Sequence, residues 1–149
     1  MTGAQSTFRR TVNASFDVLR GTVDDVIDFL ARGFGELDEA NHYELKVVLY
    51  ELLINAIRHG CKGDARRQVT VEAHLTKRGE ANVVVEDDGD GYDTLTVGID
   101  IKDPRLEAID DIAEGGRGLA IVRSLCERFS VNAKGNKVAV RKKLSRRSG

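Results

Sequence analysis

One apolar stripe constrains the fold of this 149-residue chain more than any other feature. Between residues 45 and 57, apolar side chains recur at the i, i+3, i+4, i+7 spacing of one helix face. They are Leu45, Val48, Leu49, Leu52, Leu53, Ala56 and Ile57. Gly60 and Gly63 follow and are expected to end the helix. A helix with such a continuous apolar face is expected to pack on a hydrophobic core.

The remaining elements alternate around this helix. Period-two alternation predicts strands at residues 7–14, 69–76, 82–86, 129–133 and 138–144. Helical periodicity predicts one helix that begins with Thr22 as its N-cap and ends near Gly33 or Gly35, and another from Arg117 to Phe129. A short helix is possible at 105–113. This order predicts a two-layer α/β sandwich, a mostly antiparallel mixed sheet covered on one face by helices. Residues 7–144 form the single expected domain, between a disordered N-terminus (1–6) and a basic disordered tail (145–149).

Composition excludes several classes of protein. The formal net charge of −1 provides no global field that attracts nucleic acid or an anionic membrane. No apolar run approaches the roughly 20 residues that span a bilayer. Cys61 and Cys126 have neither metal-site spacing nor the density of a disulfide scaffold. We therefore expect a cytoplasmic protein that binds neither nucleic acid nor membrane directly.

Two polar residues lie at the edge of the apolar stripe. Glu51 and Asn55 are four residues apart, so they share one helix face, one turn from each other. The amide oxygen of Asn55 can ligate Mg²⁺, which prefers oxygen ligands. The carboxylate of Glu51 can accept a proton from an attacking hydroxyl. In isolation, a solvated helix face is the more common explanation of such a pair.

Asp87 follows an apolar strand and precedes two glycines, Gly89 and Gly91. Glycines allow the backbone to approach a flat ligand closely. A carboxylate at the strand end can accept a hydrogen bond from the exocyclic amine of adenine. The alternative, about equally common, is a turn that is merely rich in Asp and Gly.

The segment Gly115-Gly116-Arg117-Gly118 precedes a predicted helix. Backbone N–H groups at a helix start bind phosphate, and Arg117 can add a charge-assisted contact. A flexible connector is the alternative. The polar stretch that comes before it, residues 88–114, is long for a compact domain, and such loops are more often functional than idle.

Two other groups of residues remain. His59 closes the helix that bears Glu51 and can support the site, whereas His42 and His74 are expected on solvated surfaces. Basic residues gather near the C-terminus, and a solvated basic end is favoured over a nucleic-acid arm. These residues are Arg141, Lys142, Lys143, Arg146 and Arg147.

Taken together, three motifs resemble the GHKL (Bergerat-fold) ATPases, and among them most of all the bacterial anti-sigma-factor serine/threonine kinases. The motifs are Glu51-x-x-x-Asn55-Ala56-x-x-His59-Gly60, Asp87-x-Gly89-x-Gly91, and Asp103-Pro104 leading to Glu114-Gly115-Gly116-Arg117-Gly118-Leu119. The resemblance covers nearly the whole chain, from Phe8 to Leu144.

This resemblance implies a site for ATP and Mg²⁺. Asn55 would ligate the metal, Glu51 would be the general base, and Asp87 would bind adenine. The other expected nucleotide contacts are His59, Gly89, Gly91, Gly115, Gly116, Arg117, Gly118 and Leu119, and residues 92–115 would form a mobile lid. The family often has Thr in the final hairpin near adenine, and here the turn is Gly135-Asn136-Lys137, where Asn136 can serve as the polar partner.

The resemblance also implies partners. The γ-phosphate would go to a serine or threonine of an anti-anti-sigma protein with a STAS fold. The same domain, usually a homodimer, would sequester a sigma factor. An ATP-binding regulatory module that switches partner binding without phosphotransfer has the same motifs and is the alternative. A detached histidine kinase catalytic domain is disfavoured, because the roughly forty residues before Glu51 begin with a strand rather than a helical dimerisation segment.

Overall fold

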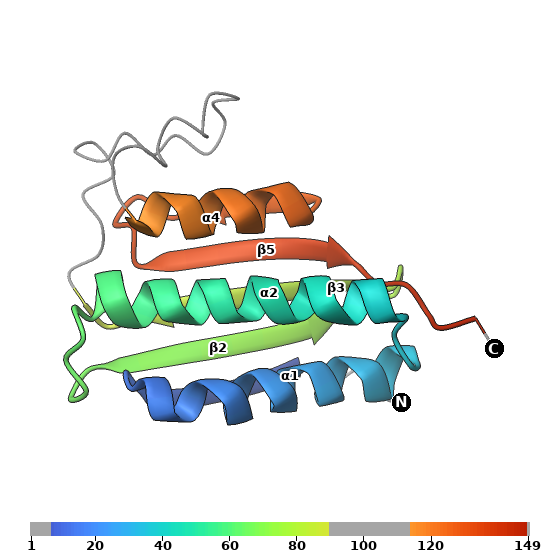
Figure 1. Ribbon diagram of the computed structural model, residues 1–149, viewed down its shortest axis with the longest axis horizontal. Coiled ribbons are helices and arrows are strands. Elements are labelled where there is room, and N and C mark those ends of the chain that lie inside the picture. Colours follow the sequence, from blue (N-terminus) through green and yellow to red (C-terminus); the bar gives the residue numbers. More distant parts are fainter. Residues whose placement is uncertain (1–6, 90–113, 149) are drawn as a thin grey trace.

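The computed structural model describes residues 7–89 and 114–148, which form two layers (Figure 1). Helices α1 (Leu19–Phe34), α2 (Glu39–Asn55) and α4 (Glu114–Leu125) lie side by side over one face of a five-stranded sheet. Helix α2 is in the middle and packs against both of its neighbours. The expected two-layer α/β sandwich is confirmed.

The sheet has the order β1-β2-β3-β5-β4. Its strands are β1 (Thr7–Asn13), β2 (Gln68–Leu75), β3 (Glu80–Asp87), β4 (Arg128–Val131) and β5 (Lys137–Lys143). Each adjacent pair is antiparallel, so the described part of the sheet is antiparallel throughout rather than mixed. The two expected hairpins, β2–β3 and β4–β5, are both present.

The stripe on α2 forms the centre of the hydrophobic core. Leu45, Val48, Leu49, Leu52 and Leu53 are each at most 1% exposed. They pack with the inward-facing side chains of the sheet, which include Val69, Val71, Val83 and Val140. Each fully buried aliphatic side chain contributes about 1.5–3 kcal/mol to folding, so this helix is anchored along its whole length.

Helix α1 begins earlier than its sequence pattern predicts. The side chain of Ser15 accepts a hydrogen bond from Asp17 N–H and caps the 3₁₀ turn η2 (Phe16–Val18), which runs directly into α1. Thr22 is 3% exposed and its hydroxyl donates to the carbonyl of Val18 at 2.7 Å. The prediction of Thr22 as N-cap is therefore wrong, because its hydroxyl is satisfied by the preceding turn inside the helix.

Lys142 is not part of a solvated basic end. Its side chain is 4% exposed, and its Nζ donates to Glu44 Oε1 at 2.8 Å and to the carbonyl of Leu125 at 2.7 Å. Period-two alternation explains the difference, because Lys142 follows Val138 and Val140 on the face of β5 that the helices cover.

The segment after β5 is also more ordered than expected for a disordered tail. Ser145 N–H donates to Asn41 Oδ1 at 3.2 Å, and Arg146 Nε donates to the carbonyl of Phe34 at 2.7 Å. Arg147 forms an exposed ion pair with Glu36 at 2.9 Å. Residues 145–147 therefore run along the connection between α1 and α2.

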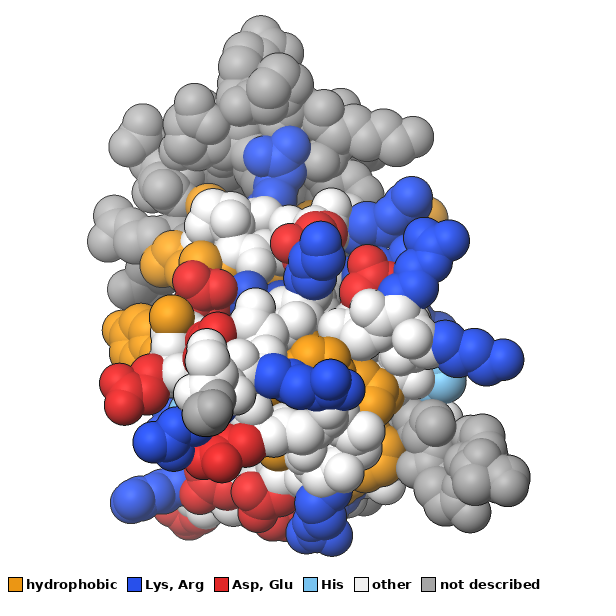
Figure 2. Space-filling model, turned by 90° about the vertical axis from the view of Figure 1, so that its right-hand side faces the viewer, with side chains coloured by type: hydrophobic (Ala, Val, Ile, Leu, Met, Phe, Trp, Pro, Cys, Tyr) orange, Lys and Arg blue, Asp and Glu red, His pale blue; other side chains and the backbone are white. Residues whose placement is uncertain are grey.

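The described surface carries charges of both signs. On the end of the molecule seen in Figure 2, basic and acidic side chains are interspersed, in keeping with the net charge of −1. No helix within residues 7–89 and 114–148 is both long enough and apolar enough to span a membrane.

Asn41 provides a test of how the C-terminal segment is held. Its buried side chain donates to the carbonyl of Lys143 at 3.1 Å and accepts from Ser145 N–H. We expect Asn41→Ala to lower the free energy of unfolding by about 1–3 kcal/mol, because both backbone partners lose a buried hydrogen bond. Chemical denaturation measures this, with Tyr43→Ala, at a side chain 68% exposed, as the control. Equal stability of the two variants would contradict the described contacts.

Candidate functional site

The edge of α2 that carries Glu51 and Asn55 faces the start of α4. Asn55 is the last residue of α2 and is 5% exposed, whereas Glu51 is partly exposed. A Cβ atom placed on Gly118 would lie 2.6 Å from Glu51 Oε1. A side chain at position 118 would therefore require Glu51 to move. The structure therefore brings two of the three motifs into direct contact.

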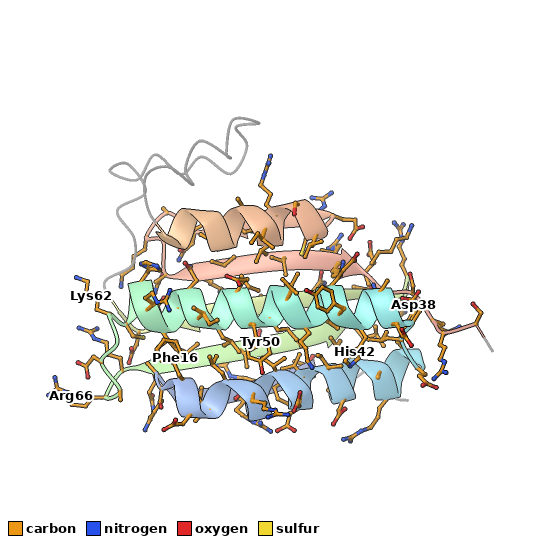
Figure 3. The ribbon with its side chains drawn as sticks, viewed as in Figure 1. Phe16, Asp38, His42, Tyr50, Lys62 and Arg66 are labelled. Carbon is orange, nitrogen blue, oxygen red and sulfur yellow. The ribbon has the colours of Figure 1, made fainter. Side chains whose placement is uncertain are left out.

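Helix α2 does not end in an ordinary cap. It widens into one turn of π-helix, η3 (Ala56–Gly60), in which Cys61 N–H donates to the carbonyl of Ala56 at 2.8 Å. Such turns are rare and occur mostly at functional sites. Lys62 follows this turn, at the opposite end of the molecule from Asp38, the N-cap of α2 (Figure 3).

The π-helical turn brings Gly60 against the end of β3. A methyl group on Gly60 would overlap Asp87 Oδ2, and one on Gly89 would overlap the carbonyl oxygen of Gly60. Gly89 N–H donates to Asp87 Oδ1 at 2.9 Å. The carboxylate is thus enclosed by backbone on two sides. The sequence indicated Gly60 only as a helix end and as part of the family motif, and its contact with Asp87 was not predicted.

Asp87 is a buried carboxylate, 5% exposed. Desolvation raises its pKa above the ordinary value, the charges of Asp88 and Glu86 raise it further, and the hydrogen bond from Gly89 N–H opposes the rise. A ligand that donates a hydrogen bond to this carboxylate would stabilise its charged form. Asp87 is therefore prepared to recognise an N–H donor.

The neighbouring thiol is not a nucleophile. Cys61 is buried, and desolvation together with the charge of Asp87 raises its pKa to about 11. A thiol needs a lowered pKa to react as a thiolate near neutral pH. This leaves Cys61 as a packing residue beside His59, which is half-buried on the π-helical turn.

The final hairpin holds the end of β3 in place. Asp87 N–H donates to the carbonyl of Asn136 at 2.9 Å, and Asn136 Nδ2 donates to the carbonyl of Asp87 at 3.0 Å. Asn132 Oδ1 in turn accepts from the N–H groups of residues 135–137. Asn136 therefore contacts the backbone of Asp87, the residue expected to bind adenine.

Several expected site residues contribute less than predicted or lie outside the described residues. Leu119 is 3% exposed and belongs to the core, so its side chain does not face a ligand. Gly115 and Gly116 lie in the first turn of α4, which begins at Glu114 and ends at Leu125 rather than spanning 117–129. Gly91, the Arg117 side chain, the possible helix at 105–113 and nearly all of the expected lid fall outside the description.

A cleft among the described residues lies away from the expected site residues. A cleft of about 450 Å³ near the end of α4 is lined by Arg123, Cys126, Glu127, Arg128, Phe129 and Ser130, none of them an expected site residue. Residues 7–89 and 114–148 contain no group of three or more His, Cys, Asp or Glu side chains arranged to hold a metal ion.

Comparison with known families identifies the fold. The family model described as the histidine kinase-like ATPase domain matches residues 13–142. The chain belongs to this family. The resemblance to GHKL ATPases stated from the motifs is thereby confirmed.

Relatives of this ATPase domain include named bacterial regulators. It is 29% identical over 105 residues to the anti-sigma F factor of Shouchella clausii, covering 68% of this chain and 69% of that protein. It is 27% identical over 135 residues to the serine-protein kinase RsbW of Bacillus subtilis, covering 86% and 78%.

A solved structure shows the same fold. The RsbU and RsbW domains of a Mycobacterium tuberculosis protein match this ATPase domain with a TM-score of 0.62 and 19% identity. The match covers 96% of this chain and 34% of that one, so the ATPase domain spans about a third of that longer chain.

Gly60 tests the close packing at Asp87. We expect Gly60→Ala to destabilise the fold by about 1–3 kcal/mol, because its methyl group has to displace Asp87. Gly21→Ala is the control, since a Cβ there meets nothing within 4 Å and a helical position gains about 0.5–1 kcal/mol. Denaturant unfolding measures both. A Gly60→Ala variant as stable as Gly21→Ala would show that the turn is looser than described.

Proposed function

We propose that this chain is an ATP-dependent protein serine/threonine kinase and anti-sigma factor. It transfers the γ-phosphate of ATP to a serine or threonine of a STAS-domain anti-anti-sigma partner, and it sequesters a sigma factor. The observation that carries the proposal is the contact of Gly118 with Glu51, because it brings an acidic side chain to the start of a glycine-rich helix. The names of the two relatives support the same activity.

The described residues fit both ends of a nucleotide, its adenine at Asp87 and its phosphates at the start of α4. The Asp87 carboxylate can accept a hydrogen bond from the adenine amine, and Gly60 and Gly89 leave only backbone beside it. The first N–H groups of α4 have no partner within the helix and favour phosphate. The last turn of α2 and the π-helical turn η3 connect Glu51 at the phosphate end with Gly60 at the adenine end.

Asn55 is the residue that would hold Mg²⁺. Its buried amide sits one turn after Glu51, and it provides an oxygen without adding negative charge beside the phosphates. When bound, the metal would neutralise negative charge on the phosphate oxygens.

Glu51 is the proposed general base. Its carboxylate accepts the proton of the partner's hydroxyl while that oxygen forms a bond to the γ-phosphorus and the bond from phosphorus to the β–γ bridging oxygen breaks, releasing ADP. Glu51 is partly exposed, so a hydroxyl on another protein can reach it. The N–H groups at the start of α4 stabilise the charge that the phosphate carries during transfer.

The proposed setting follows from the same family. We infer a homodimer in the cytoplasm that exchanges between a sigma factor and the STAS-domain partner, and no direct contact with nucleic acid or membrane. Phosphorylation of the STAS partner would release it and leave the dimer free to bind the sigma factor. Phosphotransfer with purified candidate partners tests the substrate, and sedimentation tests the dimer.

Substitution of Glu51 separates chemistry from binding. We expect Glu51→Gln to bind ATP within about threefold of the unmodified protein but to lose at least about 100-fold in phosphotransfer, because the amide cannot accept the proton. Glu39→Gln, at an exposed position of the same helix, is the control. Transfer from labelled ATP to a STAS-domain partner provides the measurement.

Two results would contradict the proposed catalytic role of Glu51. Undiminished transfer by Glu51→Gln would remove Glu51 from that role. If the unmodified protein transferred no phosphate while ATP still changed its affinity for the partner, the domain would be a regulatory module without kinase activity.

The substitution Asp87→Asn tests the pH dependence of stability and the proposed contact with adenine. Because the pKa of Asp87 is raised in the folded protein, ionisation of Asp87 lowers the free energy of unfolding progressively as pH rises from the ordinary carboxyl pKa to the raised pKa. We expect Asp87→Asn to be more stable than the unmodified protein at pH 7.5, with a difference that shrinks as pH falls below the raised pKa and vanishes near the ordinary value. ATP affinity should fall about 10- to 100-fold, because one oxygen accepts from Gly89 and the new NH₂ group would face the adenine amine.

Thermal unfolding from pH 4 to 8 and calorimetric ATP titration measure both effects. Asp24→Asn, the same substitution at an exposed position of α1, is the control and should change neither property strongly. Unchanged ATP affinity in Asp87→Asn would disprove its contact with adenine.

A further inference from the structure

Lys142 is a buried charge without a role in the site just described. Of the Lys, Arg, Asp and Glu side chains in residues 7–89 and 118–148, only Asp87 and Lys142 are buried. Lys142 Nζ reaches two elements at once, Glu44 Oε1 on α2 at 2.8 Å and the carbonyl of Leu125, the last residue of α4, at 2.7 Å. One side chain on β5 therefore joins α2 to the C-terminal end of α4.

The position of this junction matches the contact between Glu51 and Gly118. Glu44 precedes Glu51 by two helical turns on α2, and Leu125 follows Gly118 by two helical turns on α4. The two helices run antiparallel (Figure 1). Lys142 thus holds one end of the helix pair, and the close approach of Gly118 to Glu51 lies at the other end, so sliding of α4 along α2 would change both.

Stability alone does not account for a lysine at this position. Desolvation of an ammonium group is costly, and apolar replacements of buried ion pairs are often as stable or more stable. The Coulomb attraction is also limited, because the Glu44 side chain is 42% exposed. What an apolar side chain cannot supply is a directed bond to the last carbonyl of α4 together with one to α2.

We propose that Lys142 is a positioning residue, which fixes the register of α4 on α2 and so keeps the phosphate-binding start of α4 beside Glu51. This inference rests on the proposed function of the site. The adenine end depends on Gly60, Asp87 and Gly89, none of which lies on α4. Loss of the Lys142 bonds is therefore expected to affect the phosphate end and spare the adenine end.

The test compares ligands that reach different parts of the site. Calorimetric affinities for Mg–ATP and for adenosine are measured in Lys142→Met, with Lys143→Met as the matched control, because Lys143 is the exposed neighbour on the same strand. We expect ATP affinity to fall about 10-fold in Lys142→Met and adenosine affinity to stay within about 2-fold. The control should change neither affinity.

A second variant guards against a folding defect. Glu44→Gln weakens the same junction at a partly exposed residue and leaves Lys142 in place. It should lower ATP affinity relative to adenosine in the same direction, and phosphotransfer should show a lower kcat with a higher KM for ATP. A merely structural role would lower the melting temperature without changing the ratio of the two affinities.

The outcomes separate this proposal from the one on which it rests. If the unmodified protein binds neither ATP nor adenosine, the proposed function fails. If it binds both, and Lys142→Met and Glu44→Gln keep the unmodified affinity ratio, Lys142 has no positioning role. If Lys142→Met does not fold, the affinity ratio of Glu44→Gln decides.

Discussion

The burial of one face of α2 on the sheet is the constraint on which the rest of this structure depends. Because its leucine and valine side chains are fully buried along the helix, α2 cannot shift or rotate, and its polar edge is presented at a fixed place. Glu51 and Asn55 lie on that edge, and the π-helical turn that follows delivers Gly60 to the end of β3. One well-packed helix therefore positions the proposed base, the proposed metal ligand and one wall of the proposed adenine pocket.

Glycine lies at the close approaches of α4 and of the end of β3 to this helix and its π-helical extension. Gly118 meets Glu51, and Gly60 and Gly89 meet around Asp87. A methyl group on Gly60 or Gly89 would overlap its neighbour, and one on Gly118 would require Glu51 to move. The two buried charges lie at different ends of the same arrangement, Asp87 beside Gly60 and Gly89, and Lys142 where α4 is held to α2. Close packing with glycine at its contacts therefore brings residues of the three motifs together.

Much of this could be predicted from the sequence, because the decisive patterns are local. The stripe on α2 and the alternation in β2 and β5 have clear periods, and the order of elements indicated the layers. Asp87 at a strand end was also a local signal. The π-helical turn, the contact of Gly60 with Asp87 and the burial of Lys142 were missed, since each depends on residues far away in the chain, such as Glu44 and Leu125 for Lys142. The N-cap prediction for Thr22 failed for a different reason. A threonine hydroxyl can cap a helix start or donate to a carbonyl of the preceding turn, and Thr22 does the second.

The most direct test of the central claim is an NMR titration of the full chain with Mg–ATP, followed at the backbone amides. If the three motifs form one nucleotide site, the amides of Asn55, Gly60, Gly89 and Gly118 will all shift, and all will give the same dissociation constant. Amides at the other end of the β2–β3 pair, such as those of Leu75 and Asn82, will move little. Shifts confined to one motif, or dissociation constants that differ between Gly60 and Gly118, would contradict a single site for base, metal and phosphates.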